Sequence, residues 1–348
     1  MELIPRIHHL QSIVTIFIYC LDTDRNRIWA KSFSKIQGVI HSTDRLLEKV
    51  SQVQDTLESV EDSRALQIYP QKQGEYAVDK MVAPFLCYQL LLEVLLSPDY
   101  ISPKSTCSEL VEALRQYSSN DEYGSQLVDE FQRTYKPEKA LFWLMHDTPL
   151  KRLVNKALRE QDINMLFLLR FLLVDIHYLL TQNQAQSMNV FKLQTMSKTE
   201  MESIRASPGQ LIVVNGFLAA SSNKSQLVST TTNSDEFETV LFDIQASNRP
   251  GVASFGFIRD INSSVQENAD REVLFMCGSM FEIDSFINEN SMWKLSLKLL
   301  SDRDSAVLHD MKQTLRKDKN LSMIGDLLNQ SNQEEKAAVY YQRLFIEL

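Results

Sequence analysis

Two carboxylates separated by one residue, Asp270 and Glu272, stand immediately before the apolar run Val273–Cys277. Side chains two residues apart in an extended segment point to the same side, so both acids can face one cleft while the run enters a sheet. Paired acids at the mouth of a strand suggest chemistry on a sugar. The alternative is an ordinary acidic loop in solvent, and the context of the pair has to decide between the two.

Two blocks upstream supply that context. They read VFKLQ at 190–194 and NGFLAAS at 215–221. In this order and spacing, the three blocks resemble the arginine-specific mono-ADP-ribosyltransferases. In that family an aromatic-Arg block, an Asn-x-Phe-x-Ser-Thr-Ser block and a Glu-x-Glu-Val-Leu block form one nicotinamide dinucleotide cleft. The likeness covers residues 188–300 well and the region before them more loosely.

The resemblance implies a role for each matched position. The family's Arg anchors the two phosphates, its first Ser orients the ribose, and its second Glu opposes the positive charge that develops when nicotinamide leaves. The matching positions here hold Lys192, Ala219 and Glu272, so only the carboxylate is unchanged. The family's first Glu, which steers and deprotonates the acceptor guanidinium, is replaced by Asp270.

The two departures weaken the implied site without removing it. Lys192 keeps the positive charge but lacks the planar fork that grips phosphate in two places. Ala219 loses a hydroxyl whose hydrogen bond is worth about 0.5–1.5 kcal/mol, and more if it is aimed at transition-state charge. Ser221, two residues along, faces the same side of a strand and offers partial rescue. Gln194 relates to Lys192 in the same way and is a further candidate for the cleft.

Composition sets limits on other functions. The chain has 348 residues, of which 44% are hydrophobic and 23% charged, which is ordinary for a globular protein of two or three domains. A net charge of −9 argues against general binding of nucleic acid or anionic membranes. The four cysteines lack the close spacing of zinc or redox motifs and indicate structural thiols in a reducing compartment. We expect no metal, no membrane segment and a cytoplasmic location, although a missing N-terminal part would weaken the last inference.

The hydrophobic pattern predicts an α+β protein with four segments. Residues 1–60 contain two buried strands, 12–20 and 36–41, and a helix near 43–57, which is a partial α/β segment: the tail of a larger domain or an adaptor. Residues 61–187 read as a mainly helical lobe. Residues 188–300 read as strands and correspond to the mixed-sheet ADP-ribosyltransferase core on which that lobe packs. Residues 301–348 are helical.

The helices predicted in the lobe span 76–96, 108–117, 123–135, 139–145, 150–160 and 164–181. The last of them carries Arg170, Asp175 and His177 on an otherwise apolar helix. We expect paired charges of the core or of an interface there, and the alternative is a set of ligands for phosphate or substrate. In the final segment, Gly325, Ala337 and Tyr341 fall at packing positions of a tetratricopeptide unit. A plain helical hairpin explains them equally well.

Two functions of different classes follow. The first is transfer of ADP-ribose from NAD, or NADP, to arginine side chains of a protein acceptor, with Glu272 and Asp270 as catalytic residues and a weakened site. The second is a catalytically silent relative that binds a dinucleotide, or binds a partner protein through the C-terminal helical unit.

Overall fold

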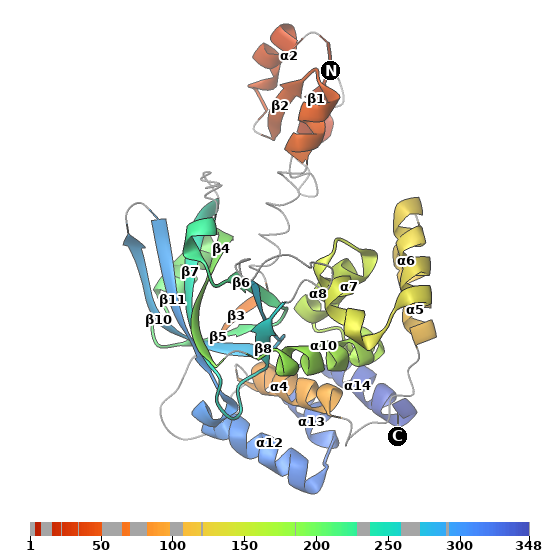
Figure 1. The fold of residues 1–348 in the computed structure, drawn as a ribbon, viewed down its shortest axis with the longest axis vertical. Coiled ribbons are helices and arrows are strands. Elements are labelled where there is room, and N and C mark those ends of the chain that lie inside the picture. Colours follow the sequence, from red (N-terminus) through yellow and green to blue (C-terminus); the bar gives the residue numbers. More distant parts are fainter. Residues whose placement is uncertain are drawn as a thin grey trace. The chain divides into compact units, whose positions relative to one another are not determined.

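The computed structural model describes residues 4–7, 16–21, 23–33, 35–50, 65–69, 82–97, 107–119, 121–184, 186–227, 237–258, 272–289 and 292–347. The chain forms two compact units, residues 1–61 and residues 62–348 (Figure 1). Each is described by itself. No helix among these residues combines the length and the apolar character needed to span a bilayer.

Unit 1 contains a short parallel pair of strands. Its elements are α1 Ile4–Ile7, β1 Ile16–Tyr19, α2 Thr23–Ala30 and β2 Ile36–Ile40, followed by helical residues 43–50. Strand β1 runs parallel to β2, with Tyr19 opposite Ile40. A parallel pair needs a crossover, which α2 provides by packing against β2. The strands predicted over 12–20 and 36–41 are confirmed where the structure describes them, and residues 12–15 lie outside the described residues.

Unit 2 is built around a mixed sheet that has nine strands among the described residues, in the order β3-β5-β10-β11-β7-β4-β6-β9-β8. The strands are β3 Leu66–Tyr69, β4 Ser187–Ser197, β5 Leu211–Val214, β6 Leu218–Ser221, β7 Phe237–Ser247, β8 Phe255–Phe257, β9 Glu272–Phe275, β10 Ser279–Glu289 and β11 Met292–Leu300. Strand β11 runs parallel to β7, and the other neighbours are antiparallel. The α+β class predicted from the sequence is confirmed.

The sheet has a narrow joint between β4 and β6. Strand β4 pairs with β7 along its whole length, from Ser187 to Ser197. Its pairing with β6, by contrast, is one residue long, Phe191 opposite Ser221. The sheet therefore consists of a long section that ends at β4 and a short section, β6-β9-β8, that meets it at this pair.

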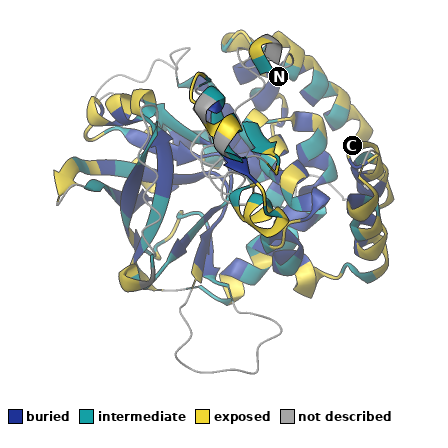
Figure 2. Cartoon of the chain, turned by 90° about the horizontal axis from the view of Figure 1, so that it is seen from above, coloured by how far each residue is buried: buried dark blue, intermediate teal, exposed yellow. Residues whose placement is uncertain are grey.

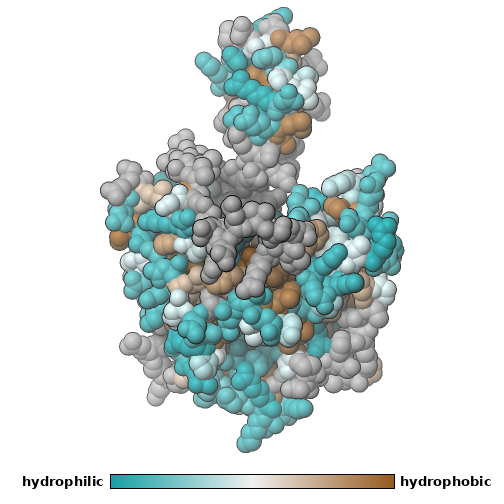
Figure 3. Space-filling model, viewed as in Figure 1, coloured by the Kyte–Doolittle hydropathy of each residue, from teal (hydrophilic) through white to brown (hydrophobic). Residues whose placement is uncertain are grey.

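Most helices of unit 2 lie to the right of the sheet in Figure 1, and α12 lies below it. They are α4 Ala83–Leu96, α5 Cys107–Tyr117, α6 Glu122–Thr134, α7 Ala140–Met145, α8 Pro149–Glu160, α9 Ile163–Leu168, α10 Arg170–Gln182, α12 Ala306–Asp318, α13 Ser322–Gln330 and α14 Glu334–Glu347. Side chains of Asp121, Thr148 and Asp162 cap the first turns of α6, α8 and α9. Helix α6 buries only one of its faces. The surface of the molecule over α6 is largely hydrophilic (Figure 3).

Two hydrophobic cores hold unit 2 together, and buried residues follow the strands and the inward helix faces (Figure 2). One core lies within the sheet and contains Phe242, Phe275 and Phe281. The other runs through the helices from Phe85 of α4 to Leu344 of α14. The C-terminal helices are thus part of the same core as α4 and α10. Gly325 of α13 lies against the ring of Tyr341 so closely that a Cβ atom there would overlap it.

Three details differ from the sequence-based expectation. Strand β3 lies inside the range predicted to be helical, because it pairs with the distant β5. A helix, α11 Lys198–Arg205, interrupts the range predicted as strands, and the signal for it is a capping box between Ser197 and Glu200. The single helix predicted over 164–181 is two helices that meet at Leu169, whose ψ of −5° departs from helical geometry.

Candidate active site

Glu272 opens β9 and lies directly opposite Ser221 of β6. Residues opposite each other in an antiparallel pair project from the same face, with Cβ atoms about 4.5–5.5 Å apart. The Glu272 side chain is exposed, whereas the rest of β9 is buried. The carboxylate therefore lies at the solvent end of a buried strand, beside a serine that is 51 residues earlier in the sequence.

Ala219 belongs to the same face of the short section. It pairs with Leu274, which lies two residues from Glu272, so Ala219, Ser221 and Glu272 project from one side. Ala219 is half-buried and packs on the helical core. The hydroxyl of Ser221 accepts a hydrogen bond from the backbone N–H of Asn223 at 3.0 Å, which holds the turn that follows β6. Two of the sequence-matched positions, Ala219 and Glu272, are thus brought together.

Strand β4 contributes Phe191 to the site formed by Ala219, Ser221 and Glu272. It is the residue opposite Ser221 at the joint of the two sheet sections. The ammonium of Lys224, in the 3-10 turn Lys224–Gln226 just beyond β6, lies 5.8 Å from the centre of the Phe191 ring. A cation at this distance from an aromatic face is attracted by the ring quadrupole. Lys224 is not among the site residues predicted from the sequence, where the signal for it is a basic residue three positions after Ser221.

Lys192 and Gln194 follow Phe191 on β4 but alternate to the other face of that strand. Lys192 is half-buried and opposite the buried Phe242. Gln194 is 2% exposed, and its amide donates to the carbonyl of Thr195 at 3.3 Å. Lys192 is therefore the residue next to the joint, but its side chain lies on the face of β4 opposite to that of Phe191. Asp270 lies outside the described residues.

The charged residues of α10 have partners in the protein. Arg170 is buried and donates to the carbonyls of Leu95 and Ser97, at the end of α4. Asp175 accepts a hydrogen bond of 2.6 Å from the hydroxyl of Tyr135. These contacts give Arg170 and Asp175 structural roles within the helical lobe, through hydrogen bonds to carbonyls and a hydroxyl. Within the part of the chain that the structure describes, no group of three His, Cys, Asp or Glu residues is arranged to hold a metal.

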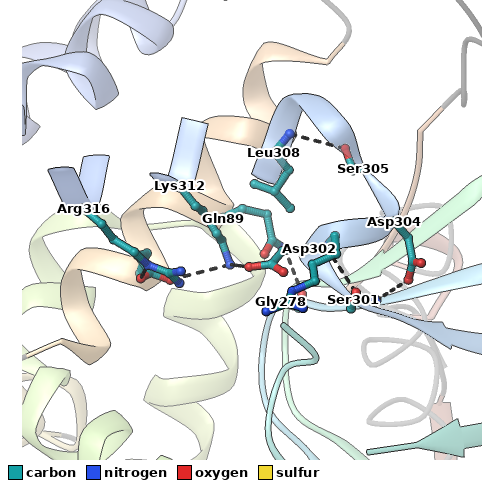
Figure 4. Close-up of polar contacts among 11 residues, drawn as sticks. Gln89, Gly278, Ser301, Asp302, Asp304, Ser305, Leu308, Lys312 and Arg316 are labelled. Atoms are coloured by element: carbon teal, nitrogen blue, oxygen red, sulfur yellow. Dashed lines mark hydrogen bonds and ion pairs between the residues drawn. The ribbon is translucent and has the colours of Figure 1, made fainter. Parts of the chain in front are cut away.

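A separate cavity of about 400 Å³ lies beyond the far end of β9, next to Met276–Gly278. Charged residues that line this cavity connect α4 to α12. The Lys312 Nζ of α12 lies 3.6 Å from a carboxylate oxygen of Glu93 in α4 and 3.7 Å from one of Asp302. Arg316 donates to Glu93 at 2.8 Å, and Figure 4 shows Lys312 and Arg316 reaching inward from α12. Since Lys312 and Glu93 have side chains only 13% and 18% exposed, this network ties the C-terminal helices to the lobe.

The network predicts a dependence of stability on pH. Burial alone raises the pKa of Glu93, but the hydrogen bond from Arg316 and the charges of Lys312 and Arg316 outweigh burial and hold this pKa below its usual 4.5. The folded state then binds fewer protons than the unfolded state, so the stabilisation is complete above 4.5 and is lost as pH falls through the folded-state pKa. We expect the free energy of unfolding to fall as the pH drops below 4.5, and to fall less in Glu93→Gln, as measured by urea denaturation. Equal losses in both proteins would contradict this role of Glu93.

Comparison with known proteins gives structural likenesses only. No protein-family model matches the chain, and no curated protein matches it. The C3 exoenzyme of Clostridium limosum is 15% identical, with a TM-score of 0.36 over 53% of this chain and 94% of its own. Plx2a, an ADP-ribosyltransferase toxin from Paenibacillus larvae, is 15% identical, with a TM-score of 0.34 over 53% of this chain and 97% of its own. Vis toxin, an ADP-ribosyltransferase from Vibrio splendidus, is 14% identical, with a TM-score of 0.31 over 66% of this chain and 89% of its own. These scores are too low to establish a shared fold, and the function proposed below rests on this chain's own residues.

Proposed function

We propose that this protein transfers ADP-ribose from NAD to arginine side chains of an acceptor protein, at a site with reduced activity. The observation that carries the proposal is the pairing of Glu272 with Ser221, with Ala219 on the same face and Phe191 across the joint. Three blocks that are distant in sequence thereby become neighbours at one edge of the short sheet section. Two of the neighbouring positions, Ala219 and Glu272, are those to which the resemblance to arginine-specific ADP-ribosyltransferases assigns functional residues, and Phe191 directly precedes a third, Lys192.

Cleavage of NAD in this proposal depends mainly on a carboxylate next to the ribose. The bond between the nicotinamide nitrogen and the ribose C1′ breaks, and neutral nicotinamide leaves with the bonding electrons. Glu272 opposes the positive charge left on the ribose, a form of electrostatic stabilisation that is worth most where water is excluded. A guanidinium nitrogen of the acceptor then bonds to C1′ and gives its proton to Asp270. Water in place of arginine gives hydrolysis of NAD.

Binding of the two phosphates is where this site is weakest. Lys192 supplies a single positive charge where the family has a two-pronged guanidinium. We assign to Lys224 a second positive charge that contacts the phosphates, because its ammonium lies over the Phe191 ring at the joint, on the side of Ser221. Ser221 completes the proposed dinucleotide contacts, standing in for the hydroxyl that Ala219 lacks, whereas Gln194 is buried on the other face of β4 and is left out of them.

Restoring the two altered positions tests this assignment. Lys192→Arg together with Ala219→Ser should raise NAD turnover by about tenfold or more, equivalent to about 1.4 kcal/mol in the barrier. Nicotinamide release by the purified full chain measures it. A control with the same chemical changes elsewhere, Lys298→Arg with Ala253→Ser, should leave turnover unchanged. No gain from the first pair would remove Lys192 and Ala219 from the site.

A second function is favoured by the same departures. With neither the serine hydroxyl at Ala219 nor a guanidinium at Lys192, the cleft would bind a dinucleotide without cleaving it. The chain would then act as a binding module, with the hairpin of α13 and α14 as a tetratricopeptide-like surface for a partner protein. Calorimetric binding of NAD with no nicotinamide release, both before and after the double reversion, would favour this function over transfer.

A further inference from the structure

Unit 1 contains a cavity of about 320 Å³ between α2, β2 and the helical residues 43–50. Its lining contains four basic side chains and one histidine: Arg27, Lys31, His41, Arg45 and Lys49. None of the described residues that line it is acidic. In a chain with a net charge of −9, such a concentration of positive charge is a local feature that composition does not explain.

The cations converge because of their spacing. Arg27 and Lys31 are four residues apart at the end of α2, and Arg45 and Lys49 are four residues apart in the second helix. Arg45 and Lys49 therefore lie on one face of the second helix, Arg27 lies in the last turn of α2 with Lys31 directly after the helix, and all four line the same cavity. The acidic residues of the second helix, Asp44 and Glu48, do not belong to the lining.

The floor of the cavity is apolar backbone and side chain from β2. Val39 and Ile40 are 8% and 5% exposed, and Ala30 of α2 beside them is 6% exposed. The cavity also lies alongside the carboxyl end of β2, where His41 follows the strand, and ligands of parallel α/β structures bind at such ends. Among the described residues, Lys31 and Arg45 form no ion pair, so these two charges are available to a ligand.

We propose that this cavity binds a compact oligophosphate, a site separate from the dinucleotide cleft of unit 2. Two opposed pairs of cations match a chain of phosphate groups, and Arg27 and Arg45 provide the bidentate geometry that phosphate prefers. A volume of about 320 Å³ suits a small ligand. The apolar floor provides a surface for an organic group attached to the phosphates.

Calorimetry on the full chain at low salt tests the site with three probes: inorganic triphosphate, ATP and inositol trisphosphate. We expect triphosphate to bind, with an affinity that falls as salt is added. Tighter binding of ATP would identify a nucleotide, and tighter binding of inositol trisphosphate a lipid headgroup. Lys31→Gln with Arg45→Gln should weaken binding about tenfold or more, while Arg25→Gln with Lys35→Gln removes the same charge outside the cavity and should change it less than twofold.

Hydrogen exchange on the unaltered protein gives a second readout that does not depend on variants. Triphosphate should slow amide exchange in peptides covering 27–31 and 36–49 and leave those covering Glu272 unchanged. The proposal is overturned if no probe binds, if both charge-removing pairs weaken binding equally, or if protection appears only in unit 2. Tighter binding of single-stranded RNA than of triphosphate would equally exclude a compact ligand.

Discussion

Replacing Glu272 by glutamine should reduce NAD turnover at least about a hundredfold, for both hydrolysis and transfer. The substitution preserves the size of the side chain at the exposed start of β9, so the strand and its pairing with Ser221 should persist. What is lost is the negative charge that opposes the positive charge on the ribose. Asp270→Asn should differ in kind, because it removes only the group that accepts a proton from arginine: transfer should fall while hydrolysis continues.

The control for this experiment is Glu289→Gln, which removes the same charge from the exposed end of β10. It should leave both activities unchanged. Chromatographic measurement of free nicotinamide and of labelled acceptor separates hydrolysis from transfer. Small and equal effects of Glu272→Gln, Asp270→Asn and Glu289→Gln would mean that the acids before β9 form an ordinary solvated turn.

Removing the charge of Lys312 should destabilise unit 2 by about 3 kcal/mol. When one partner of a buried ion pair is removed, the charge of the other partner stays buried and uncompensated. Lys312 lies between Glu93 and Asp302, whose side chains are 18% and 5% exposed. Lys312→Met retains most of the aliphatic stem, so its effect on the free energy of unfolding reports the charge rather than the packing. Urea denaturation of the full chain measures it.

The comparison variant for Lys312 is Lys317→Met, in the exposed last turn of the same helix. It should change the free energy of unfolding by less than about 0.5 kcal/mol. If Lys312→Met were equally mild, the ion pairs between α4 and α12 would contribute no more than surface contacts, and the attachment of the C-terminal helices would depend on their apolar core alone.

Local patterns in the sequence were sufficient for most helices and for the strands that bear the candidate site. The buried run after Glu272 predicts β9, and the apolar periodicity of the lobe predicts α4 to α8. The pairing of the strands could not be predicted in this way, because strand register depends on contacts between segments that are distant in the sequence. No local signal indicates that Ser221 lies opposite Glu272, that Phe191 forms the joint, or that Lys224 reaches its ring.

The same distinction explains the structural differences. Strand β3 has only four residues and depends on β5 for its pairing, so its sequence alone does not distinguish it from a loop. Helix α11 carried a local signal, the capping box from Ser197 to Glu200, which the alternation of strands around it obscured. The burial of Lys312 arises only when α12 packs on α4, and a lysine in an amphipathic helix is ordinarily solvated.

The most direct test of the central claim is incubation of the purified full chain with NAD labelled in its adenylate part and an arginine-rich acceptor protein. We predict release of nicotinamide and attachment of label to the acceptor through a linkage to arginine, with both signals absent in Glu272→Gln. The contradicting result is that neither the unaltered chain nor the Lys192→Arg, Ala219→Ser variant releases nicotinamide or labels the acceptor above the Glu272→Gln background.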